Sequence, residues 1–292
     1  MGSTTGTAMT AALKKYISSG YRTVDGWLSA IAIKSTAELG ALQKRLGVSG
    51  AVSEIGVHHG RLFILLHLLT DAPEKSVAWD LFESQYENAD GSGHGDRRLL
   101  QTNLIKHGCD LSRIKINTVN SLTLTASRIT AECESKVRIF SVDGGHSAAS
   151  TFSDLKVATD TLCEGGLILL DDFPNADWPG VAEGACRYLD HRRGSLFPVA
   201  IVGNKFIFTN TQAMAKIYAR DLYDLNYHSG CRIKRSLIFD GAVLTITPYG
   251  APHARVIDQT LDYVSDSRIW ESLRYTATGR FFKVLLRQLK DV

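Results

Sequence analysis

The sequence has no hydrophobic run of the length that a membrane span needs, and we expect no signal peptide from its first residues. Its longest apolar stretch, Leu62 to Leu69, is interrupted by His67 and falls far short of the about 20 residues that a membrane span requires. The amino terminus reads MGSTTGTAMTAALKKY, without the hydrophobic core of a signal peptide, and Gly6 stands where a myristoylation motif has Ser or Thr. We therefore expect a cytoplasmic protein with no membrane partner.

An excess of charge of one sign is also absent, and cysteine is scarce. The 33 Lys and Arg residues balance the 30 Asp and Glu residues to leave a net charge of +3. A balanced surface offers no basic field to nucleic acid, so we expect no such partner. The five cysteines are an odd number without a C-x-x-C pair, which argues against a disulfide framework and against a thiolate zinc site.

Low-complexity runs, internal repeats and flexible linkers are missing as well. The six prolines are scattered over the 292 residues, so we predict one main domain with additions at both ends. Residues 1–46 have the apolar spacing of helices and suit a lid or the contact of a homo-oligomer, residues 47–212 form the core, and residues 213–292 are an appendage. The appendage contains a strand-rich patch over Ser236–Thr247 and a basic end from Arg280 to Lys290.

From Ala51 onward, short apolar runs alternate with helical patterns. This alternation predicts an α/β fold in which helices cover both faces of a parallel sheet. Gly165-Gly166 is expected to stop one helix before a central strand. The predicted strands are Ala51–Ile55, Ser76–Phe82, Arg113–Val119, Val137–Val142, Gly166–Leu170 and an antiparallel pair, Pro198–Val202 with Lys205–Thr209. The predicted helices are Arg61–Leu69, Asp96–His107, Leu122–Ala131, Ala148–Leu162 and Trp178–Arg192.

Polar side chains stand at the carboxyl ends of the first five predicted strands. In open parallel sheets, loops and helix amino termini converge at these ends and form the ligand site. We therefore expect the residues that follow the strands to gather at one edge of the sheet. In chain order they are Glu54, Asp80, Asn120 with Ser121, Asp143 with His146, and Asp171 with Asp172.

The turn after the first strand, Gly56-x-x-x-Gly60, is a candidate nucleotide loop or a helix-capping turn. It lacks the middle glycine that lets backbone amides approach a dinucleotide pyrophosphate. S-adenosylmethionine (SAM) has no phosphates, so a looser loop suffices for it. Asp80, twenty residues after Gly60, suits hydrogen bonds to both ribose hydroxyls. For His58 and His59 within the loop, packing or substrate contact is favoured over a metal or proton role.

The second constellation contains Asp143, Asp171 and Asp172. Adjacent carboxylates at the end of a buried strand are costly to keep ionised unless a cation joins them. Mg²⁺ is the natural partner of such oxygen ligands, although the segment from Asp171 to Pro174 could also be a plain turn. His146 follows Asp143 by three residues. Its ordinary pKa of about 6.5 makes it the best available general base.

Three motifs here resemble those of class I SAM-dependent methyltransferases, specifically metal-dependent O-methyltransferases that act on sugars of macrolides and aminocoumarins. The resemblance covers roughly Ala51 to Thr209, and the segment from Asp80 to Asp96 also looks like a signature loop of these relatives. The motifs are Glu54-Ile-Gly-x-x-x-Gly60, Asp143-Gly-Gly-His-Ser147 and Gly165-Gly-Leu-Ile-Leu-Leu-Asp-Asp-Phe173.

The resemblance implies a Rossmann-like sheet of seven mostly parallel strands with an antiparallel last strand. It also implies Mg²⁺-assisted transfer of a methyl group from SAM to a hydroxyl of a sugar or other polyol. By this resemblance the methionine end of SAM lies at Glu54, Gly56 and Gly60, the ribose at Asp80, and the adenine at Asn120 and Ser121. Asp143 lines the same pocket and binds Mg²⁺ with Asp171 and Asp172, while His146 takes the acceptor's proton. Some relatives have Asp where Gly145 stands, which leaves His146 as the one base candidate in that turn.

Three other functions remain open at this point. A nicotinamide-dependent oxidoreductase would use the same kind of sheet, but the middle glycine and a Tyr-x-x-x-Lys pair are absent. A non-catalytic SAM-fold or metal-binding protein would share every motif. A nucleic-acid methyltransferase is disfavoured by the balanced charge and by the lack of an Asp/Asn-Pro-Pro-Tyr motif.

Overall fold

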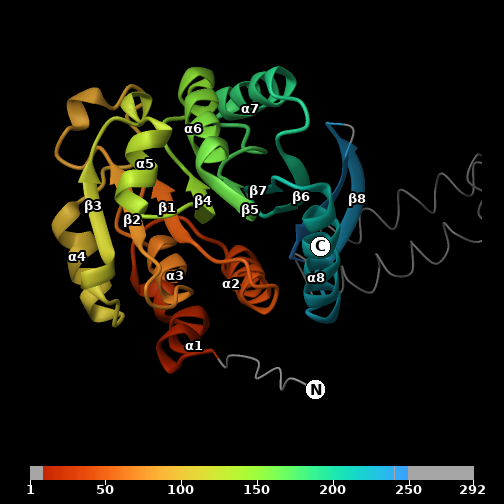
Figure 1. Ribbon diagram of the computed structural model, residues 1–292, viewed down its shortest axis with the longest axis horizontal. Helices are drawn as coiled ribbons and strands as arrows, with labels where there is room; N and C mark the ends of the chain where they lie inside the picture. The colour runs from red at the N-terminus through yellow and green to blue at the C-terminus, as the bar shows by residue number, and fades with distance from the viewer. Residues whose placement is uncertain (1–8, 240, 249–292) are drawn as a thin grey trace, which may run out of the picture.

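A computed structural model describes residues 9–239 and 241–248 (Figure 1). In this part of the chain, helices lie on both faces of one central sheet, as the alternating sequence pattern predicts. The α-helices are α1 (Ala11–Ser18), α2 (Ala30–Arg45), α3 (Phe63–Leu68), α4 (Arg97–Lys106), α5 (Ala126–Cys133), α6 (Ala148–Thr161), α7 (Pro179–His191) and α8 (Gln212–His228). The strands are β1 (Ala51–Ile55), β2 (Ser76–Asp80), β3 (Ile114–Thr118), β4 (Val137–Val142), β5 (Leu162–Leu170), β6 (Phe197–Val202), β7 (Lys205–Thr209), β8 (Arg232–Ile238) and β9 (Gly241–Thr247). Short 3₁₀ helices are η1 (Gly20–Thr23), η2 (Gln85–Glu87), η3 (Leu111–Arg113) and η4 (Ser121–Thr123).

The sheet has the strand order β3-β2-β1-β4-β5-β7-β6-β9-β8. Strands β1 to β5 are parallel, and β7 is antiparallel to both β5 and β6. The mostly parallel sheet and the antiparallel pair are therefore confirmed. The predicted number of seven strands is wrong, because nine strands pair in this sheet within the residues that the structure describes.

The two additional strands come from the segment that the sequence marks as an appendage. Within the strand-rich patch, β9 pairs in parallel with β6, with Ala200 opposite Leu244, and β8 pairs with β9. Strand β6 would otherwise offer unpaired backbone groups at an edge, and β9 satisfies them while burying Val243 and Ile246. The edge then passes to β8, whose sequence RIKRSLI is rich in cations, a feature that opposes edge-to-edge association.

Alternate residues of the strands build two hydrophobic cores, one on each face of the sheet. In β5, Leu167 and Leu169 belong to the core beneath α1, α2, α3, α4 and α8. Ile168 and Leu170 belong to the core beneath α5, α6 and α7. Figure 1 shows these two helical layers above and below the sheet. Burial on both faces explains why β5 has an unbroken apolar run.

The junction between α6 and β5 differs from its prediction. The helix ends at Thr161 and the strand begins at Leu162, so Gly165-Gly166 lies inside β5 rather than in a helix stop. The register between β4 and β5 shifts here, which is the mark of a bulge, and Gly165 takes a positive φ of 71°. The side chain of Asn210 bonds to the backbone of Cys163 and of Gly165, at 2.8 and 2.9 Å. These bonds satisfy groups that the bulge leaves without a ladder partner.

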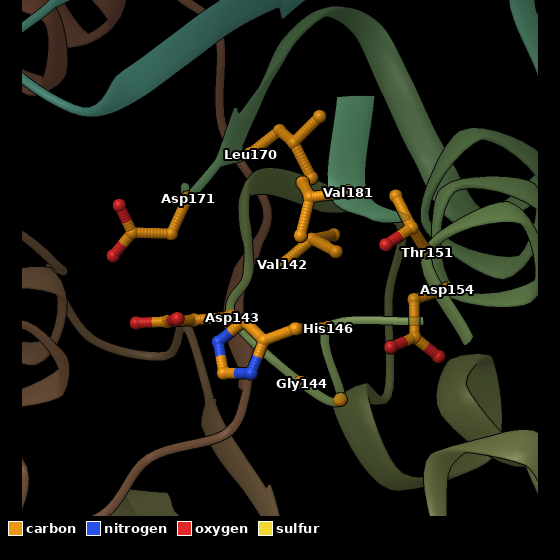
Figure 2. Close-up of a pocket in the computed structure, with 10 residues that line it drawn as sticks. Val142, Asp143, Gly144, His146, Thr151, Asp154, Leu170, Asp171 and Val181 are labelled. Carbon is orange, nitrogen blue, oxygen red and sulfur yellow. The ribbon is translucent and has the colours of Figure 1, made fainter. Parts of the chain in front are cut away.

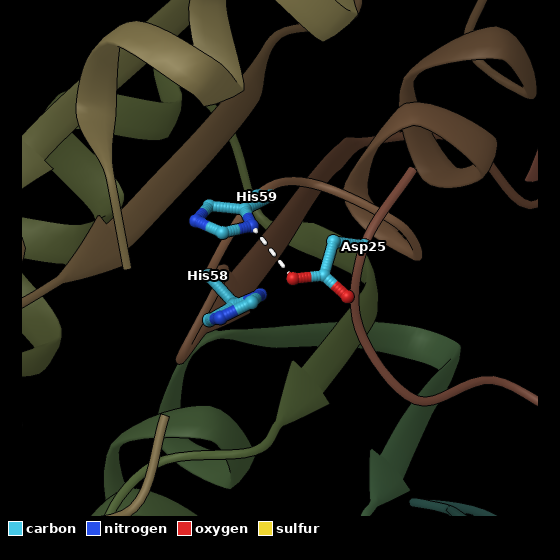
Figure 3. Close-up of side chains that lie close together, drawn as sticks. All are labelled: Asp25, His58 and His59. Atoms are coloured by element: carbon cyan, nitrogen blue, oxygen red, sulfur yellow. Dashed lines mark ion pairs between the residues drawn. The ribbon is translucent and has the colours of Figure 1, made fainter. Parts of the chain in front are cut away.

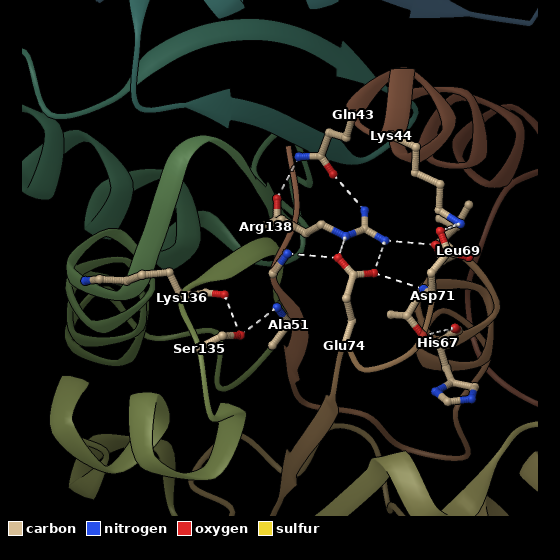
Figure 4. Close-up of polar contacts among 12 residues, drawn as sticks. Gln43, Lys44, Ala51, His67, Leu69, Asp71, Glu74, Ser135, Lys136 and Arg138 are labelled. Carbon is tan, nitrogen blue, oxygen red and sulfur yellow. Dashed lines mark hydrogen bonds and ion pairs between the residues drawn. The ribbon is translucent and has the colours of Figure 1, made fainter. Parts of the chain in front are cut away.

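Beside this bulge, near the start of β4, the side chain of Arg138 is fully buried and joins several elements (Figure 4). Its Nε donates to Glu74 at 3.0 Å, its Nη1 to Gln43 at 2.9 Å and its Nη2 to the carbonyl of Leu69 at 2.9 Å. Gln43 donates back to the Arg138 carbonyl at 2.8 Å. The guanidinium thus connects α2, the end of α3 and the approach to β2 with β4.

No helix within residues 9–239 and 241–248 is long and apolar enough to cross a membrane. The basic end from Arg280 to Lys290 lies outside the described residues. The division of the chain into segments 1–46, 47–212 and 213–292 stays a prediction.

Candidate functional site

A buried ion pair stands at the carboxyl edge of the sheet, between the end of β5 and the start of β7. Nζ of Lys205 lies 2.5 Å from Oδ2 of Asp171, and the two side chains are only 2% and 4% exposed. The antiparallel register that sets Leu170 opposite Phe206 brings Asp171 and Lys205 face to face at the next position. The chain therefore supplies a cation of its own to this carboxylate.

Further acids surround Lys205. Burial raises the pKa of Glu54 to about 8, although the charge of Lys205 and a 3.1 Å hydrogen bond from Ser141 oppose this. Burial and the charge of Asp171 raise the pKa of Asp143 well above its ordinary value. Burial alone would lower the pKa of Lys205, but Asp171 and Asp143 outweigh it and raise that pKa.

The balance of charge in this group is incomplete. Three acids, Glu54, Asp143 and Asp171, face one lysine, and Oε2 of Glu54 is buried without a hydrogen-bond partner. The raised pKa values of Glu54 and Asp143 favour their protonated forms unless a further cation joins them. The site is therefore suited to receive positive charge.

Asp172, whose backbone has a positive φ of 55°, has side-chain partners other than Lys205. Its Oδ2 lies 3.3 Å from Nε2 of His146, and its Oδ1 accepts from the amides of Asn175 at 2.9 Å and Asn204 at 3.3 Å. Burial alone would raise the pKa of Asp172, but the hydrogen bonds from His146 and the two amides lower it. Asp171 thus pairs with Lys205, whereas Asp172 contacts His146 and two side-chain amides.

His146 is held on three sides. Its Nδ1 lies 2.9 Å from Oδ2 of Asp90, which also accepts from the His146 amide at 2.8 Å. The ring stacks on Trp178, with 4.1 Å between centroids. Burial alone would lower the pKa of His146, but the bonds to Asp172 and Asp90 outweigh it and raise that pKa. These contacts fix the ring beside Asp143 and Asp172.

The segment between β2 and α4 crosses the edge of the sheet and contacts both halves of the predicted site. Besides Asp90, it contributes Ser92, whose Oγ lies 3.1 Å from Nδ1 of His146. At its other end, Gly95 packs on Asp80 so closely that a Cβ there would lie 2.8 Å from Oδ1 of the carboxylate. Only glycine fits this position without a shift. The segment thus links Asp80 to His146.

Asp80 organises the glycine loop. Its Oδ2 accepts from the amide of His58 at 2.7 Å and its Oδ1 from the amide of Phe82 at 3.0 Å. Burial raises the pKa of Asp80, while these backbone bonds oppose the change. Gly56 is required by packing, because a Cβ on it would lie 1.6 Å from the carbonyl oxygen of Asp143. Gly60 closes the loop with a φ of 90°.

Asn120 and Ser121 follow β3, as predicted, but each side chain already has a partner. Asn120 donates to Glu87 at 2.9 Å, and Ser121 donates to Oδ2 of Asp154 at 3.2 Å. Burial raises the pKa of Asp154 to about 7, and its Oδ1 has no hydrogen-bond partner. Asp154 lines a small hollow together with Asp143, His146 and Asp171.

Figure 2 shows how these groups are arranged around His146. The carboxylates of Asp143 and Asp171 point to one side of the ring, and Asp154 lies on the other. Oxygen or nitrogen atoms of Asp143, His146 and Asp172 all lie within 4.8 Å of one another. Asp171 bonds to Lys205 instead. The assignment of Asp143, Asp171 and Asp172 to a metal stays a prediction, as do the other predicted roles.

The sequence assigns no site role to Lys205, Asp154 or Trp178, and it includes Asp90 only within the signature segment from Asp80 to Asp96. In the structure, Lys205, Asp90, Asp154 and Trp178 all contact the predicted residues. A signal for Lys205 was available, since it is a lone cation at the start of the apolar strand KFIFT. Its partner depends on the pairing of β5 with β7, which the sequence pattern does not reveal.

Comparison with known proteins adds a family match. Residues 53–173 match the model of the family Methyltransf_24, a methyltransferase domain. This span includes the glycine loop, Asp80, Asp143, His146, Asp171 and Asp172. No curated protein matches the chain.

Solved structures of O-methyltransferases resemble the fold at low identity. NovP is 13% identical with a TM-score of 0.54, over 63% of this chain and 81% of NovP. TomG from Streptomyces achromogenes, which is involved in tomaymycin synthesis, is 14% identical with a TM-score of 0.48, over 70% and 91% of the two chains. CalS11, a TDP-rhamnose 3'-O-methyltransferase of calicheamicin biosynthesis, is 15% identical with a TM-score of 0.48, over 68% and 92%.

The family match lies on the segment that carries the predicted motifs, and the likeness to NovP shows a shared fold. Together they confirm the resemblance to class I SAM-dependent methyltransferases: the chain carries a methyltransferase domain in residues 53–173.

Proposed function

We propose that this methyltransferase moves the methyl group of SAM to a hydroxyl of a sugar or another small polyol, with help from Mg²⁺. The family match supports methyl transfer. The acidic strand ends support a cationic methyl donor and a divalent cation at one edge of the sheet. The observation that carries the proposal is the shortage of positive charge around Glu54, Asp143 and Asp171.

The residues near β1 fit SAM in their chemistry. SAM supplies an activated methyl group on a sulfonium and carries an ammonium group that donates hydrogen bonds. Oε2 of Glu54, buried and without a partner, is an acceptor for such a cation, and leaving it unpaired costs about 1–3 kcal/mol. Asp80, fixed by two backbone amides, keeps lone pairs for ribose hydroxyls.

The residues near β4 and β5 fit a divalent cation through Asp143 and Asp172. Mg²⁺ prefers carboxylate oxygens and keeps positions for water or for substrate hydroxyls, so it would orient and acidify the acceptor. The pKa of Asp143 is raised by burial and by Asp171. A cation bound beside Asp143 would lower this pKa and favour the ionised carboxylate. Asp171 is bonded to Lys205 and would act indirectly, by holding the positive charge of Lys205 beside Asp143.

His146 is the group suited to remove the acceptor's proton. Asp90 and Trp178 hold its ring, and Nε2 lies on the side of Asp172. A positioned base typically contributes a rate factor of about 10²–10⁴. Alignment of the acceptor oxygen with the methyl donor can lower the barrier by roughly 7–11 kcal/mol more.

Calorimetric titration of the full-length protein with S-adenosylhomocysteine tests the cofactor assignment. We expect Asp80→Asn and Glu54→Gln each to weaken binding about 10- to 100-fold, because each removes a charged acceptor. Asp110→Asn, at an exposed carboxylate outside the site, is the matched control and should bind as the wild type does. Wild-type affinity in both site variants would refute the cofactor site.

Transfer of labelled methyl from SAM to a panel of sugar nucleotides and free polyols tests the reaction. We expect transfer to stop with a chelator, to return with Mg²⁺, and to fall strongly in Asp172→Asn. Turnover that survives both the chelator and Asp172→Asn would exclude the metal role while leaving methyl transfer intact.

A further inference from the structure

A second group of metal-binding side chains lies beside the glycine loop. Asp25 comes from the segment between η1 and α2, and His58 and His59 come from the loop after β1 (Figure 3). One ligand atom of each residue lies within 4.8 Å of the other two. Nδ1 of His59 is 3.6 Å from Oδ2 of Asp25. Residues more than 30 positions apart in the chain therefore converge here.

Side chains that bond to backbone carbonyls hold these two segments together. Arg61 donates through Nε to the carbonyl of Tyr21 at 2.9 Å and through Nη1 to the carbonyl of Gly26. It thereby ties the segment of Asp25 to the loop of the two histidines. Asn103 donates to the carbonyl of His59 at 3.0 Å. The three side chains are thus presented from two segments that are already joined.

The donor atoms are available for a ligand. Oδ1 of Asp25 accepts from the amide of Gly26 at 3.0 Å, while Oδ2 faces His59. Nδ1 of His58 is buried and has no hydrogen-bond partner. An unpaired buried nitrogen costs free energy and calls for a partner. The ring centroids of His58 and His59 lie 3.8 Å apart, and those of Trp27 and His58 lie 5.7 Å apart.

We propose that Asp25, His58 and His59 bind a divalent transition-metal ion of the Zn²⁺ type. Two imidazoles and one carboxylate suit Zn²⁺, Co²⁺ or Ni²⁺ rather than Mg²⁺, which prefers oxygen. Three protein ligands leave at least one position for water or another ligand. This assignment replaces the packing or substrate-contact role that the sequence favours for the two histidines.

The ion would fasten the amino-terminal segment onto the loop that Asp80 supports. The amide of His58 bonds to Asp80 at 2.7 Å, so the metal and Asp80 would fix the same loop from two sides. The site is separate from the group of Asp143, His146 and Asp172. Metal binding by Asp25, His58 and His59 does not depend on the proposed methyl transfer.

Calorimetric titration of the full-length protein with Zn²⁺ tests the site, and an Asp172→Asn background removes a ligand of the other group. In this background we expect Asp25→Asn and His59→Gln each to lower Zn²⁺ affinity at least about 100-fold, since loss of a residue that merely supports a ligand already costs 10- to 100-fold. His191→Gln, an exposed histidine outside both groups, should bind as the background protein does. The side chain of Asp25 is 84% exposed, so Asp25→Asn should fold normally.

The absorption spectrum of the Co²⁺ form provides a second, direct measurement. We expect Asp25→Cys to keep Co²⁺ binding and to add a thiolate-to-metal charge-transfer band, which arises only if residue 25 is a ligand. Absence of the band, or unchanged Zn²⁺ affinity in Asp25→Asn and His59→Gln, would overturn the proposal. So would Zn²⁺ binding that disappears in the Asp172→Asn background alone.

Discussion

Asp171 and Lys205 form a buried ion pair across β5 and β7, with 2.5 Å between Oδ2 and Nζ. The pair places a permanent positive charge among the acids at the carboxyl edge of the sheet. Lys205 therefore balances the negative charge of Asp171. Asp143 and Asp172 lie in a different group, with His146.

Removal of the lysine should destabilise the protein strongly. Lys205→Met leaves the charge of Asp171 buried without its partner, which typically costs about 3–5 kcal/mol. Urea unfolding measures this loss. The double variant Lys205→Met with Asp171→Leu should recover part of it, because an apolar pair replaces the two charges. A single variant as stable as the wild type would show that the pair contributes nothing to folding.

Asp154 should make stability depend on pH. Burial raises its pKa to about 7 in the folded protein, from 3.8 ordinarily. The folded state thus binds the proton more tightly between these values, and the unfolding free energy falls as pH rises through about 7. The full effect is roughly 4 kcal/mol at 1.36 kcal/mol for each pKa unit.

The variant Asp154→Asn has no such proton and should not show this contribution. The difference in unfolding free energy between wild type and variant, measured by denaturant at several pH values, should therefore move in the variant's favour as pH rises from 4 to 8. A difference that stays constant with pH would contradict the raised pKa.

His146 should matter to turnover more than to cofactor binding. His146→Gln removes the proposed base, and we expect kcat to fall about 10²–10⁴-fold. S-adenosylhomocysteine affinity, measured on the same preparation, should change little. Trp178→Leu removes the stacked partner of the ring and should lower kcat less. Normal kcat in His146→Gln would exclude this residue as the base.

Arg138 should act on stability alone. Arg138→Leu leaves Glu74 and the Leu69 carbonyl without a bonded guanidinium, so we expect a loss of about 3–5 kcal/mol in urea unfolding. Lys136→Met, which changes an exposed neighbour, is the control and should cost less than about 1 kcal/mol. At low temperature, folded Arg138→Leu should keep the wild-type affinity for S-adenosylhomocysteine. A selective loss of that affinity would argue for a role at the site.

Much of the architecture follows from local sequence patterns. The apolar run Leu167–Leu170 and the polar residues directly after each strand reflect burial of both faces and the open carboxyl edge. The residues at which helices and strands end follow less directly from the sequence. Gly165-Gly166 suits a helix stop by local chemistry, yet the register between β4 and β5 places it in a bulge. Strands β8 and β9 join the sheet because β6 leaves an edge to pair with, a property of the assembled sheet.

The sequence by itself determined the alternating fold, the place of the acids at strand ends, and the motifs of a methyltransferase domain. Only the tertiary structure decided their partners. Strand pairing sets Asp171 opposite Lys205, and the turn after β5 brings Asp172 within 3.3 Å of His146. Convergence of distant segments brings Asp25 close to His58 and His59. Side-chain periodicity reports burial along one element, whereas these contacts depend on the register and crossing of elements far apart in the chain.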